Sequence, residues 1–453
     1  MAGYFDAENL EVLGQALARL QQGFAGLPAA QPETLDERGR EALLAAADRL
    51  TDNYPYFHPL YVGQMLKPPH PVARLAYALT MYINPNNHAL DGGRASSQME
   101  KEVVADIGAM FGWEQCLGHL TSGGTMANFE ALWIGRELRP GTAVAASAQS
   151  HYTHPRLSAV LGVPFVEIAV DAQGRMDPAD LQQKLGRGDI GTVVATLGTT
   201  AAGAVDPLSV IADLCRQHDV QLHVDTAYGG YYRLCDNLGS SAAEAYEAIG
   251  RADSIVVDPH KHGLQPYGCG CVLFRDPAAG RFYQHDSPYT YFSSDDLHLG
   301  EISLECSRAG AAAVALWTTM QALPAVPGGE FARSLQTCRE AALQLHAGLL
   351  ERNYCKPLFA PELDIVVWAV PADTASESSR RAQEIFSAAA NHDLHLAVAG
   401  FPRAMCEAAG AVQEWDQESL TCLRACVMKP EHHDWVGQIL QRLDLVAKQL
   451  ELT

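Results

Sequence analysis

The stretch SIVVDPHKHGLQPYG, residues 254–268, runs from small and apolar residues into Asp258 and then places Lys261 between two histidines. Residues 254–257 have the short apolar pattern typical of a buried strand that ends at a turn. An ammonium group beside a core strand is not a generic surface charge, because burying an unpaired charge is costly. We therefore expect Lys261 to pair with a specific acid or to react with a specific group.

Similar short apolar segments alternate with helical segments around this stretch. They are AVAAS (143–147), FVEIAV (165–170), TVVATLG (192–198), QLHVDTA (221–227) and CGCVLFR (269–275). Strands that alternate with helices indicate an α/β fold with a mainly parallel sheet. The sequence thus predicts a large α/β domain over residues 61–328.

Helical periodicity flanks this domain on both sides. Residues 7–24 and 36–50 predict an N-terminal helical arm within residues 1–60, whose leucine stripe would pack on this chain or on a partner subunit. A long helix near residue 330, the strand-like segments DIVVWAV (364–370) and LRACVMK (423–429), and a last helix predict a smaller α/β domain over 329–453. The segment NPNNHALDGG (84–93) is predicted to be a loop, because Asn, Pro and Gly dominate it.

Composition excludes several classes of partner. The formal net charge of −21 predicts repulsion from nucleic acid and from anionic membranes. No apolar run is long enough to span a bilayer, and residues 1–14 lack the basic and apolar regions of a signal peptide. The eleven cysteines are irregularly spaced without a CxxC pair, which favours reduced thiols in the cytoplasm over disulfides or a zinc site.

The segment LTSGGTMAN, residues 120–128, passes from a strand-like start through two glycines into a helix. Glycines allow the backbone to approach a ligand, and the amides of a helix N-terminus bind anions, most often phosphate. Candidate phosphate-binding residues are Ser122, Gly123, Gly124 and Thr125. A simple glycine turn with a capped helix is the structural alternative.

Asp225 and Lys261 each follow a strand-like segment, where α/β proteins bind their ligands. Taken alone, Asp225 is more typical of a residue that caps a helix. Together with a phosphate-binding turn, a strand-end carboxylate and a strand-end lysine are the groups that hold pyridoxal phosphate (PLP). The lysine forms a Schiff base with the aldehyde, and the carboxylate keeps the pyridine nitrogen protonated.

An ordered set of motifs resembles the PLP-dependent group II amino acid decarboxylases, which include aromatic amino acid, tyrosine, histidine, glutamate and diaminobutyrate decarboxylases. The resemblance covers about residues 55–450 and implies a fold-type I PLP enzyme with a seven-stranded, mainly parallel mixed sheet. Its motifs are HPLYVGQM (58–65), GHLTSGGTMANFEAL (118–132), SAQSHYTHPRLSAVLG (147–162), ATLGTTAAGAVDPL (195–208), HVDTAYGG (223–230), DSIVVDPHKHG (253–263) and LECSRAGAAAVALW (304–317).

The resemblance implies a role for each matching residue around the cofactor. Lys261 is expected to carry the Schiff base, and His260 to lie near the phosphate. Asp225 is expected to pair with the pyridine nitrogen, while Ala227 and His151 cover the two faces of the ring. Thr199 or Thr200, with Thr200 preferred, would lie near the ring hydroxyl. The resemblance gives no role to His119, His154 or His262, which are expected to be structural.

Further roles concern the substrate and a second subunit. The resemblance implies a homodimer with active sites at the interface, where Ser307 reaches the partner's cofactor phosphate. Arg424 lies in a strand among apolar neighbours and is expected to bind the substrate carboxylate. Asn86 and His88 are expected to line the substrate pocket. Tyr289, with Tyr291 as second choice, is expected to donate the proton that completes the reaction.

The expected reaction is α-decarboxylation of an L-amino acid to its amine and carbon dioxide. Ala148 stands where the family usually has an acid, and the substrate is expected to be aromatic, tyrosine-like, or acidic. The alternatives are a carbon–carbon lyase of the sphingosine-phosphate lyase type, a decarboxylating aldehyde synthase, and a relative that binds without catalysis.

Overall fold

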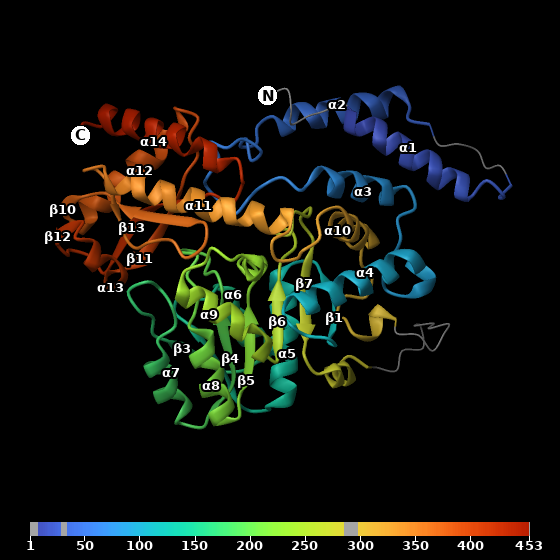
Figure 1. Ribbon diagram of the computed structural model, residues 1–453, viewed down its shortest axis with the longest axis horizontal. Helices are drawn as coiled ribbons and strands as arrows, with labels where there is room; N and C mark the ends of the chain where they lie inside the picture. The colour runs from blue at the N-terminus through green and yellow to red at the C-terminus, as the bar shows by residue number, and fades with distance from the viewer. Residues whose placement is uncertain (1–7, 29–33, 285–297, 453) are drawn as a thin grey trace.

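A computed structural model describes residues 8–28, 34–284 and 298–452. Its central element is a seven-stranded sheet in the order β1-β7-β6-β5-β4-β2-β3 (Figure 1). Strands β2 to β6 run parallel, and β7 is antiparallel to both of its neighbours. The predicted mixed, mainly parallel α/β sheet is confirmed. The strands are β1 (Leu117–Thr121), β2 (Ala143–Ser147), β3 (Phe165–Ile168), β4 (Ile190–Thr196), β5 (Gln221–Asp225), β6 (Ser254–Val257) and β7 (Gly270–Phe274).

Helices cover both faces of this sheet, which explains why its strands are nearly continuous apolar runs. Val144 and Ala146 of β2 pack with Leu132 and Leu157 of two helices, whereas Ala145 points to the opposite face and its core. The helices of this part are α3 (Pro71–Met81), α4 (Leu90–Met110), α5 (Gly124–Leu138), α6 (Thr153–Leu161), α7 (Pro178–Leu185), α8 (Leu208–His218), α9 (Ser240–Glu247) and α10 (Gly310–Ala322).

The C-terminal part forms a smaller α/β layer. Its four-stranded sheet has the order β11-β13-β9-β8, and a separate pair joins β10 and β12. The elements are α11 (Glu330–Leu350), β8 (Lys356–Pro357), β9 (Ile365–Ala369), β10 (Ala372–Thr374), α12 (Ala375–Ala390), β11 (Ala397–Pro402), α13 (Arg403–Cys406), β12 (Val412–Glu414), β13 (Ser419–Cys426) and α14 (His432–Gln449).

The side chains of β13 alternate between two cores, which shows which face of the strand each residue occupies. Leu423 and Ala425 belong to the core beneath α11, α12 and α14, whereas Cys422 and Cys426 belong to the core shared with the large sheet. Because alternate residues of a strand point to the same face, Arg424 lies on the face turned toward the large sheet.

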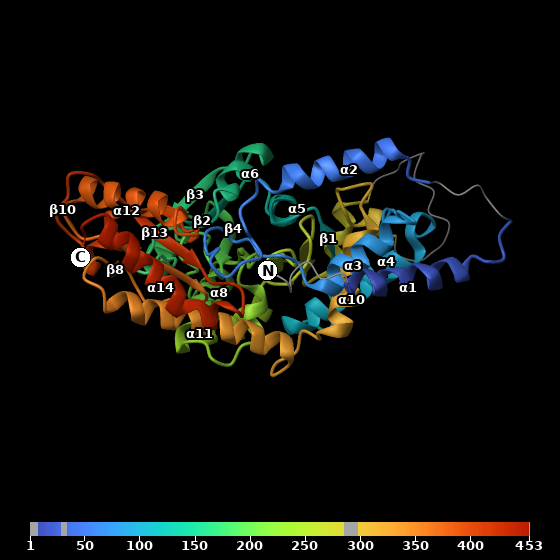
Figure 2. The same cartoon turned by 90° about the horizontal axis from the view of Figure 1, so that it is seen from above.

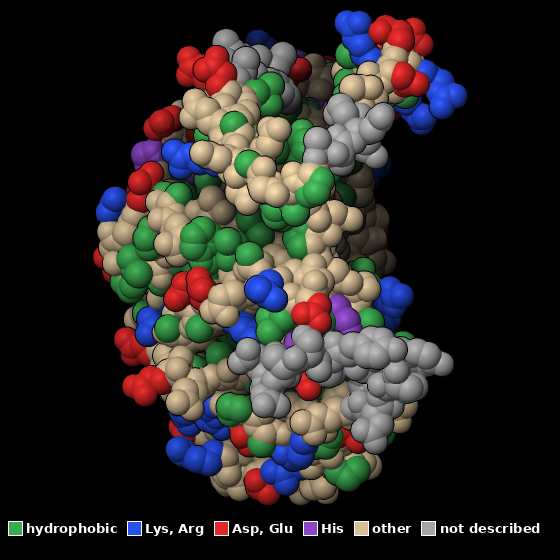
Figure 3. All heavy atoms as spheres, turned by 90° about the vertical axis from the view of Figure 1, so that its right-hand side faces the viewer, with side chains coloured by type: hydrophobic (Ala, Val, Ile, Leu, Met, Phe, Trp, Pro, Cys, Tyr) green, Lys and Arg blue, Asp and Glu red, His purple; other side chains and the backbone are tan. Residues whose placement is uncertain are grey.

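Helices α1 (Glu8–Gly23) and α2 (Glu37–Leu50) extend away from the C-terminal layer (Figure 2). Neither helix contains a buried residue, and Leu10, Leu43 and Leu44 are more than half exposed. The space-filling view shows acidic and basic side chains in small, separated groups (Figure 3). In the described ranges, we find no helix with the length and apolar character needed to cross a membrane.

The prediction of a loop over residues 84–93 is wrong at its C-terminal end, because α4 begins at Leu90. Gly93 interrupts the helical backbone with φ −164° and ψ 62°. The sequence shows helical periodicity only after Gly93. The Asn and Gly residues before it therefore led to a loop prediction for the first turn of α4.

Candidate active site

A pocket of about 390 Å³ lies at the carboxyl ends of β4, β5 and β6, within the range of small-molecule sites. It brings together residues that are far apart in the sequence. The predicted site residues that line it are Ser122, Gly123, Gly124, Thr125, His151, Thr200, Asp225, Ala227, His260 and Lys261.

The turn between β1 and α5 forms one wall of this pocket. Gly123 has φ +152°, which favours glycine, and a Cβ on Gly124 would lie 2.6 Å from Asp258 Oδ2. No side chain of the described residues caps the N-terminus of α5. The pocket therefore meets an uncapped helix N-terminus, whose amides and dipole favour an anion.

Asp225 ends β5 and is only 4% exposed. Its carboxylate accepts hydrogen bonds from His154 Nε2 at 2.8 Å, Asn128 Nδ2 at 3.3 Å and the Ala227 N–H at 3.1 Å. Burial acts to raise the pKa of this carboxyl, but His154, the Ala227 amide and Lys261 outweigh it and hold the pKa well below its usual range. The pocket thus contains a permanent, fixed negative charge.

Lys261 follows β6 and points its amine toward the same space. Its Nζ lies 3.2 Å from Asp258 Oδ2, and its side chain is 20% exposed. His260 Nδ1 donates to Cys269 O at 2.8 Å, which fixes that ring beside the amine. The lysine is therefore accessible from the pocket and held by an acid.

His151 lies in the turn before α6. Its Nδ1 accepts hydrogen bonds from the Thr153 N–H at 3.3 Å and from Thr153 Oγ1 at 2.7 Å. Burial lowers the pKa of His151, with a smaller opposing effect of Asp225. The ring is therefore neutral near pH 7 and carries its hydrogen on Nε2.

Comparison with known proteins agrees with the PLP enzyme predicted from the sequence motifs. Residues 51–368 match the family model described as the pyridoxal-dependent decarboxylase conserved domain. The chain belongs to the PLP-dependent decarboxylase family. It is a PLP-dependent amino acid decarboxylase, as the motifs predicted, and PLP is its cofactor.

Relatives within this family differ in substrate. The chain is 30% identical over 332 residues to a probable L-tyrosine/L-aspartate decarboxylase of Methanothermobacter thermautotrophicus, covering 72% of this chain and 86% of the relative. It is 29% identical to an L-tyrosine decarboxylase of Enterococcus faecium, with 68% of each chain covered. It is 35% identical over 292 residues to an L-2,4-diaminobutyrate decarboxylase of Rhizobium meliloti, covering 59% of this chain and 57% of the relative.

Solved structures show the same fold at lower identity. Oryza sativa TDC with PLP and tryptamine has a TM-score of 0.78 at 15% identity, covering 98% of this chain and 99% of that chain. Mouse CSAD has a TM-score of 0.77 at 22% identity, covering 97% and 99%. The fold-type I architecture is therefore confirmed over nearly the whole chain.

The pocket of this decarboxylase fits its cofactor. The uncapped α5 N-terminus suits a phosphate, the ionised Asp225 suits a pyridinium, and Lys261 supplies the amine. Thr200 lines the pocket, whereas Thr199 is buried and its Oγ1 accepts from the Ala204 N–H at 3.0 Å. Of the two threonines, Thr200 is the one in a position to meet the cofactor.

Several predicted residues lie elsewhere. Asn86 and Ser307 touch through a 3.1 Å hydrogen bond, and His88 Nδ1 lies 3.6 Å from Cys306 Sγ, so these form a separate cluster outside the pocket lining. Arg424 is 4% exposed and does not line the pocket. Tyr289 and Tyr291 lie outside the described residues.

Other lining residues were not predicted. Asn128 lies one helical turn after Gly124, and this i, i+4 spacing was the available indication in the sequence. Tyr152, Tyr228, Asp258 and Tyr267 also line the pocket. Their patterns in the sequence are those of ordinary core or loop residues, so only the fold places them here.

Proposed function

We propose that this chain decarboxylates a free L-amino acid at the pocket formed by Asp225, His151 and Lys261. The observation that carries this proposal is the convergence of an ionised carboxylate, a lysine amine and an uncapped helix N-terminus in one pocket. These are the three groups needed at the ring nitrogen, aldehyde and phosphate of PLP.

When bound, PLP supplies an aldehyde that amines attack and a ring that accepts the electrons left by the departing carboxylate. Lys261, which lines the pocket, would hold the cofactor aldehyde in the absence of substrate. Asp225 holds a proton on the ring nitrogen, because an opposite charge at close range favours the protonated form. His151 lines the pocket with Nδ1 held by Thr153, so its Nε2 hydrogen would be available to orient the substrate beside the cofactor.

An aromatic, tyrosine-like substrate fits the described part of the pocket better than an acidic one. Tyr152 and Tyr267 supply aromatic surface to its lining. Among the described lining residues, Lys261 is the only lysine or arginine, so none remains to bind a second carboxylate. The same scarcity of cationic groups argues against a lyase acting on a phosphorylated substrate.

We also propose a homodimer with active sites at the subunit interface. The exposed leucines of α2 present an apolar face that a second subunit would cover. Asn86, His88 and Ser307 form their cluster outside the pocket of their own chain, which agrees with a role at the partner's pocket. A reducing, cytoplasmic environment fits the eleven cysteines, all of which are free thiols.

Carbon dioxide release from each standard amino acid, from diaminobutyrate and from ornithine tests the substrate proposal. We expect the highest kcat/KM with tyrosine or a related aromatic amino acid. Preferred turnover of aspartate or cysteine sulfinate would overturn the aromatic assignment.

Mixing an inactive Lys261→Ala subunit with an inactive Ser307 variant tests the dimer, because shared sites would restore part of the activity.

A further inference from the structure

Hydrogen-bond donors from two helices converge on one oxygen of Asp225. His154 in the first turn of α6 and Asn128 in α5 both donate to Oδ2, at 2.8 Å and 3.3 Å. The Ala227 N–H donates to Oδ1 at 3.1 Å. The carboxylate is thus anchored on both oxygens, and its rotamer is fixed by elements distant in sequence.

The direction of every hydrogen in this network follows from the carboxylate, which only accepts. Because Asn128 uses its Nδ2 toward Asp225, its Oδ1 faces His223 and accepts from Nε2 at 2.8 Å. His223 Nδ1 then accepts from the Ser254 hydroxyl at 2.8 Å. Burial lowers the pKa of His223 to about 3, which agrees with a neutral ring that has one N–H.

All side chains of this chain of contacts are buried. His154 is 0% exposed, His223 1% and Asn128 2%. His154 Nδ1 has no hydrogen-bond partner within the described ranges, so the single hydrogen bond of this ring goes to Asp225. A polar ring at a position needed only for packing would carry a desolvation cost that an apolar side chain avoids. Its one contact therefore points to a role at Asp225.

We propose that His154 is a positioning residue for decarboxylation, which keeps Asp225 ionised and in one orientation toward the ring nitrogen of PLP. The Asn128–His223–Ser254 chain supports the same oxygen of Asp225. This inference rests on the proposed role of Asp225. It adds that the charge and orientation of the Asp225 carboxylate depend on hydrogen-bond donors that are not themselves proposed to contact the cofactor. It revises the sequence-based expectation that His154 is only structural.

Two substitutions separate hydrogen bonding from packing. His154→Gln keeps an N–H donor, whereas His154→Leu keeps volume and loses the donor. The matched control is His119→Gln, because His119 Nε2 and Glu130 Oε2 form a 2.9 Å pair at 0% exposure away from the pocket lining. His154→Met repeats the loss with a more adaptable side chain, in case the leucine variant fails to fold.

The main readout is the protonation state of the ring nitrogen, measured by the nitrogen chemical shift of bound ¹⁵N-labelled PLP. We expect a protonated ring in the parent, in His154→Gln and in His119→Gln, and loss of the proton in His154→Leu and His154→Met. The kcat per bound cofactor should fall about 10- to 100-fold in the last two variants, the effect of a lost hydrogen bond to a charged group.

An Asp225→Asn variant distinguishes a failure of the role proposed for Asp225 from a failure of the role proposed for His154. If Asp225→Asn keeps a protonated ring nitrogen, the role proposed for Asp225 itself is wrong. If Asp225→Asn loses that proton while His154→Leu and His154→Met keep it at the parent's kcat, the role of Asp225 stands and that of His154 is overturned. Loss of the proton in the Asp225 variant and in both apolar His154 variants supports the inference.

Discussion

Tyr228 donates its hydroxyl hydrogen to Asp364 Oδ1 across 2.6 Å, and both side chains are buried. Tyr228 lines the cofactor pocket, whereas Asp364 directly precedes β9 of the C-terminal layer. The second oxygen of Asp364 lies 3.2 Å from Nε2 of His262, which directly follows Lys261 in the sequence. One buried carboxylate therefore joins the C-terminal layer to both the Asp225 and the Lys261 segments.

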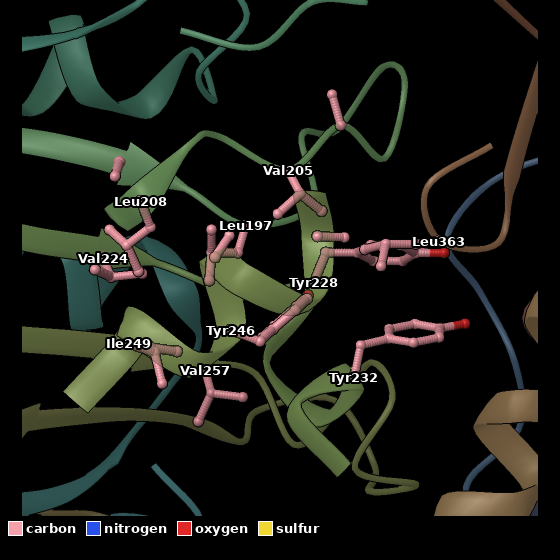
Figure 4. Close-up of a cluster of buried hydrophobic side chains, with 14 of the residues drawn as sticks. Leu197, Val205, Leu208, Val224, Tyr228, Tyr232, Tyr246, Ile249, Val257 and Leu363 are labelled. Carbon is pink, nitrogen blue, oxygen red and sulfur yellow. The ribbon is translucent and has the colours of Figure 1, made fainter. Parts of the chain in front are cut away.

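Removing the Tyr228 hydroxyl tests how much its hydrogen bond to Asp364 contributes to the free energy of unfolding. Tyr228→Phe leaves the buried Oδ1 of Asp364 without its donor, so we expect the free energy of unfolding to fall by about 1–3 kcal/mol. Tyr232→Phe is the matched control, because the Tyr232 hydroxyl is buried with no hydrogen-bond partner in the part of the chain described. The rings of both tyrosines point in the same direction, and Tyr232 extends from the short helix Gly230–Leu234 (Figure 4). Equal denaturant midpoints for the two variants would contradict this assignment.

Lys261 should be the single site of covalent cofactor attachment. Reduction with borohydride followed by peptide mass spectrometry should find the cofactor on Lys261 and not on Lys67 or Lys429. Lys261→Ala should lose amino acid turnover, and Lys261→Arg should lose it as well, because guanidinium stays protonated and is a poor nucleophile. Turnover by Lys261→Ala near the parent rate would refute the assignment.

The sequence predicted the elements whose chemistry is local. Each of three features follows an apolar, strand-like segment and is visible in the sequence itself. They are the charged residues Asp225 and Lys261 and the glycine pair Gly123–Gly124. Strand-end positions then place them together, since parallel strands share one ligand-binding edge. This reasoning recovered the sheet and the main residues of the pocket.

The same reasoning missed groups whose role depends on tertiary contacts. His154 and Asn128 lie inside helices, where helical spacing alone does not show which residues face a buried carboxylate. Asp364 is separated from Tyr228 by 136 residues, so their hydrogen bond has no local sign in the sequence. Likewise, Asn86 and His88 carry the polar character of pocket residues, yet the fold places them outside their own chain's pocket.

Lys429 should make stability depend on pH above neutrality. Burial is the main cause that lowers its pKa to about 7, although Nζ donates to Tyr56 O at 3.0 Å and Tyr61 O at 2.8 Å. Between pH 7 and about pH 10, the unfolded chain binds this proton and the folded chain does not. The free energy of unfolding should therefore rise with pH in this window, by a few kcal/mol at about 1.4 kcal/mol per pKa unit.

A Lys429→Met variant isolates this contribution from other titrating groups. Its absolute stability will shift because two hydrogen bonds are lost, so the readout is the slope of unfolding free energy against pH. We expect a flatter slope than the parent between pH 7 and pH 10. Parallel slopes for parent and variant would show that Lys429 keeps an ordinary pKa.

Arg424 carries an uncompensated charge at the face of β13 turned toward the large sheet. Its Nε and Nη2 are buried and have no hydrogen-bond partner among the described residues, and no described carboxylate pairs with it. A structural ion pair is thus not its role in the described chain. A buried guanidinium without an acid costs stability unless an anion joins it. We predict that this anion is the substrate carboxylate, although Arg424 lies outside the described lining of the pocket.

Arg424→Met should therefore separate stability from function. Removing an unpaired buried charge should leave the melting temperature unchanged or raise it, whereas kcat/KM should fall about 10- to 100-fold through loss of a charged hydrogen bond to the substrate. Arg339→Met is the opposite control, because Arg339 Nε donates to Glu362 O at 2.9 Å and a second hydrogen bond reaches Asn237 O. That control should melt at a lower temperature with kcat/KM preserved in the folded fraction. Calorimetry and steady-state kinetics on both variants decide the matter: destabilised Arg424→Met with normal kinetics would assign Arg424 to the fold rather than to the substrate.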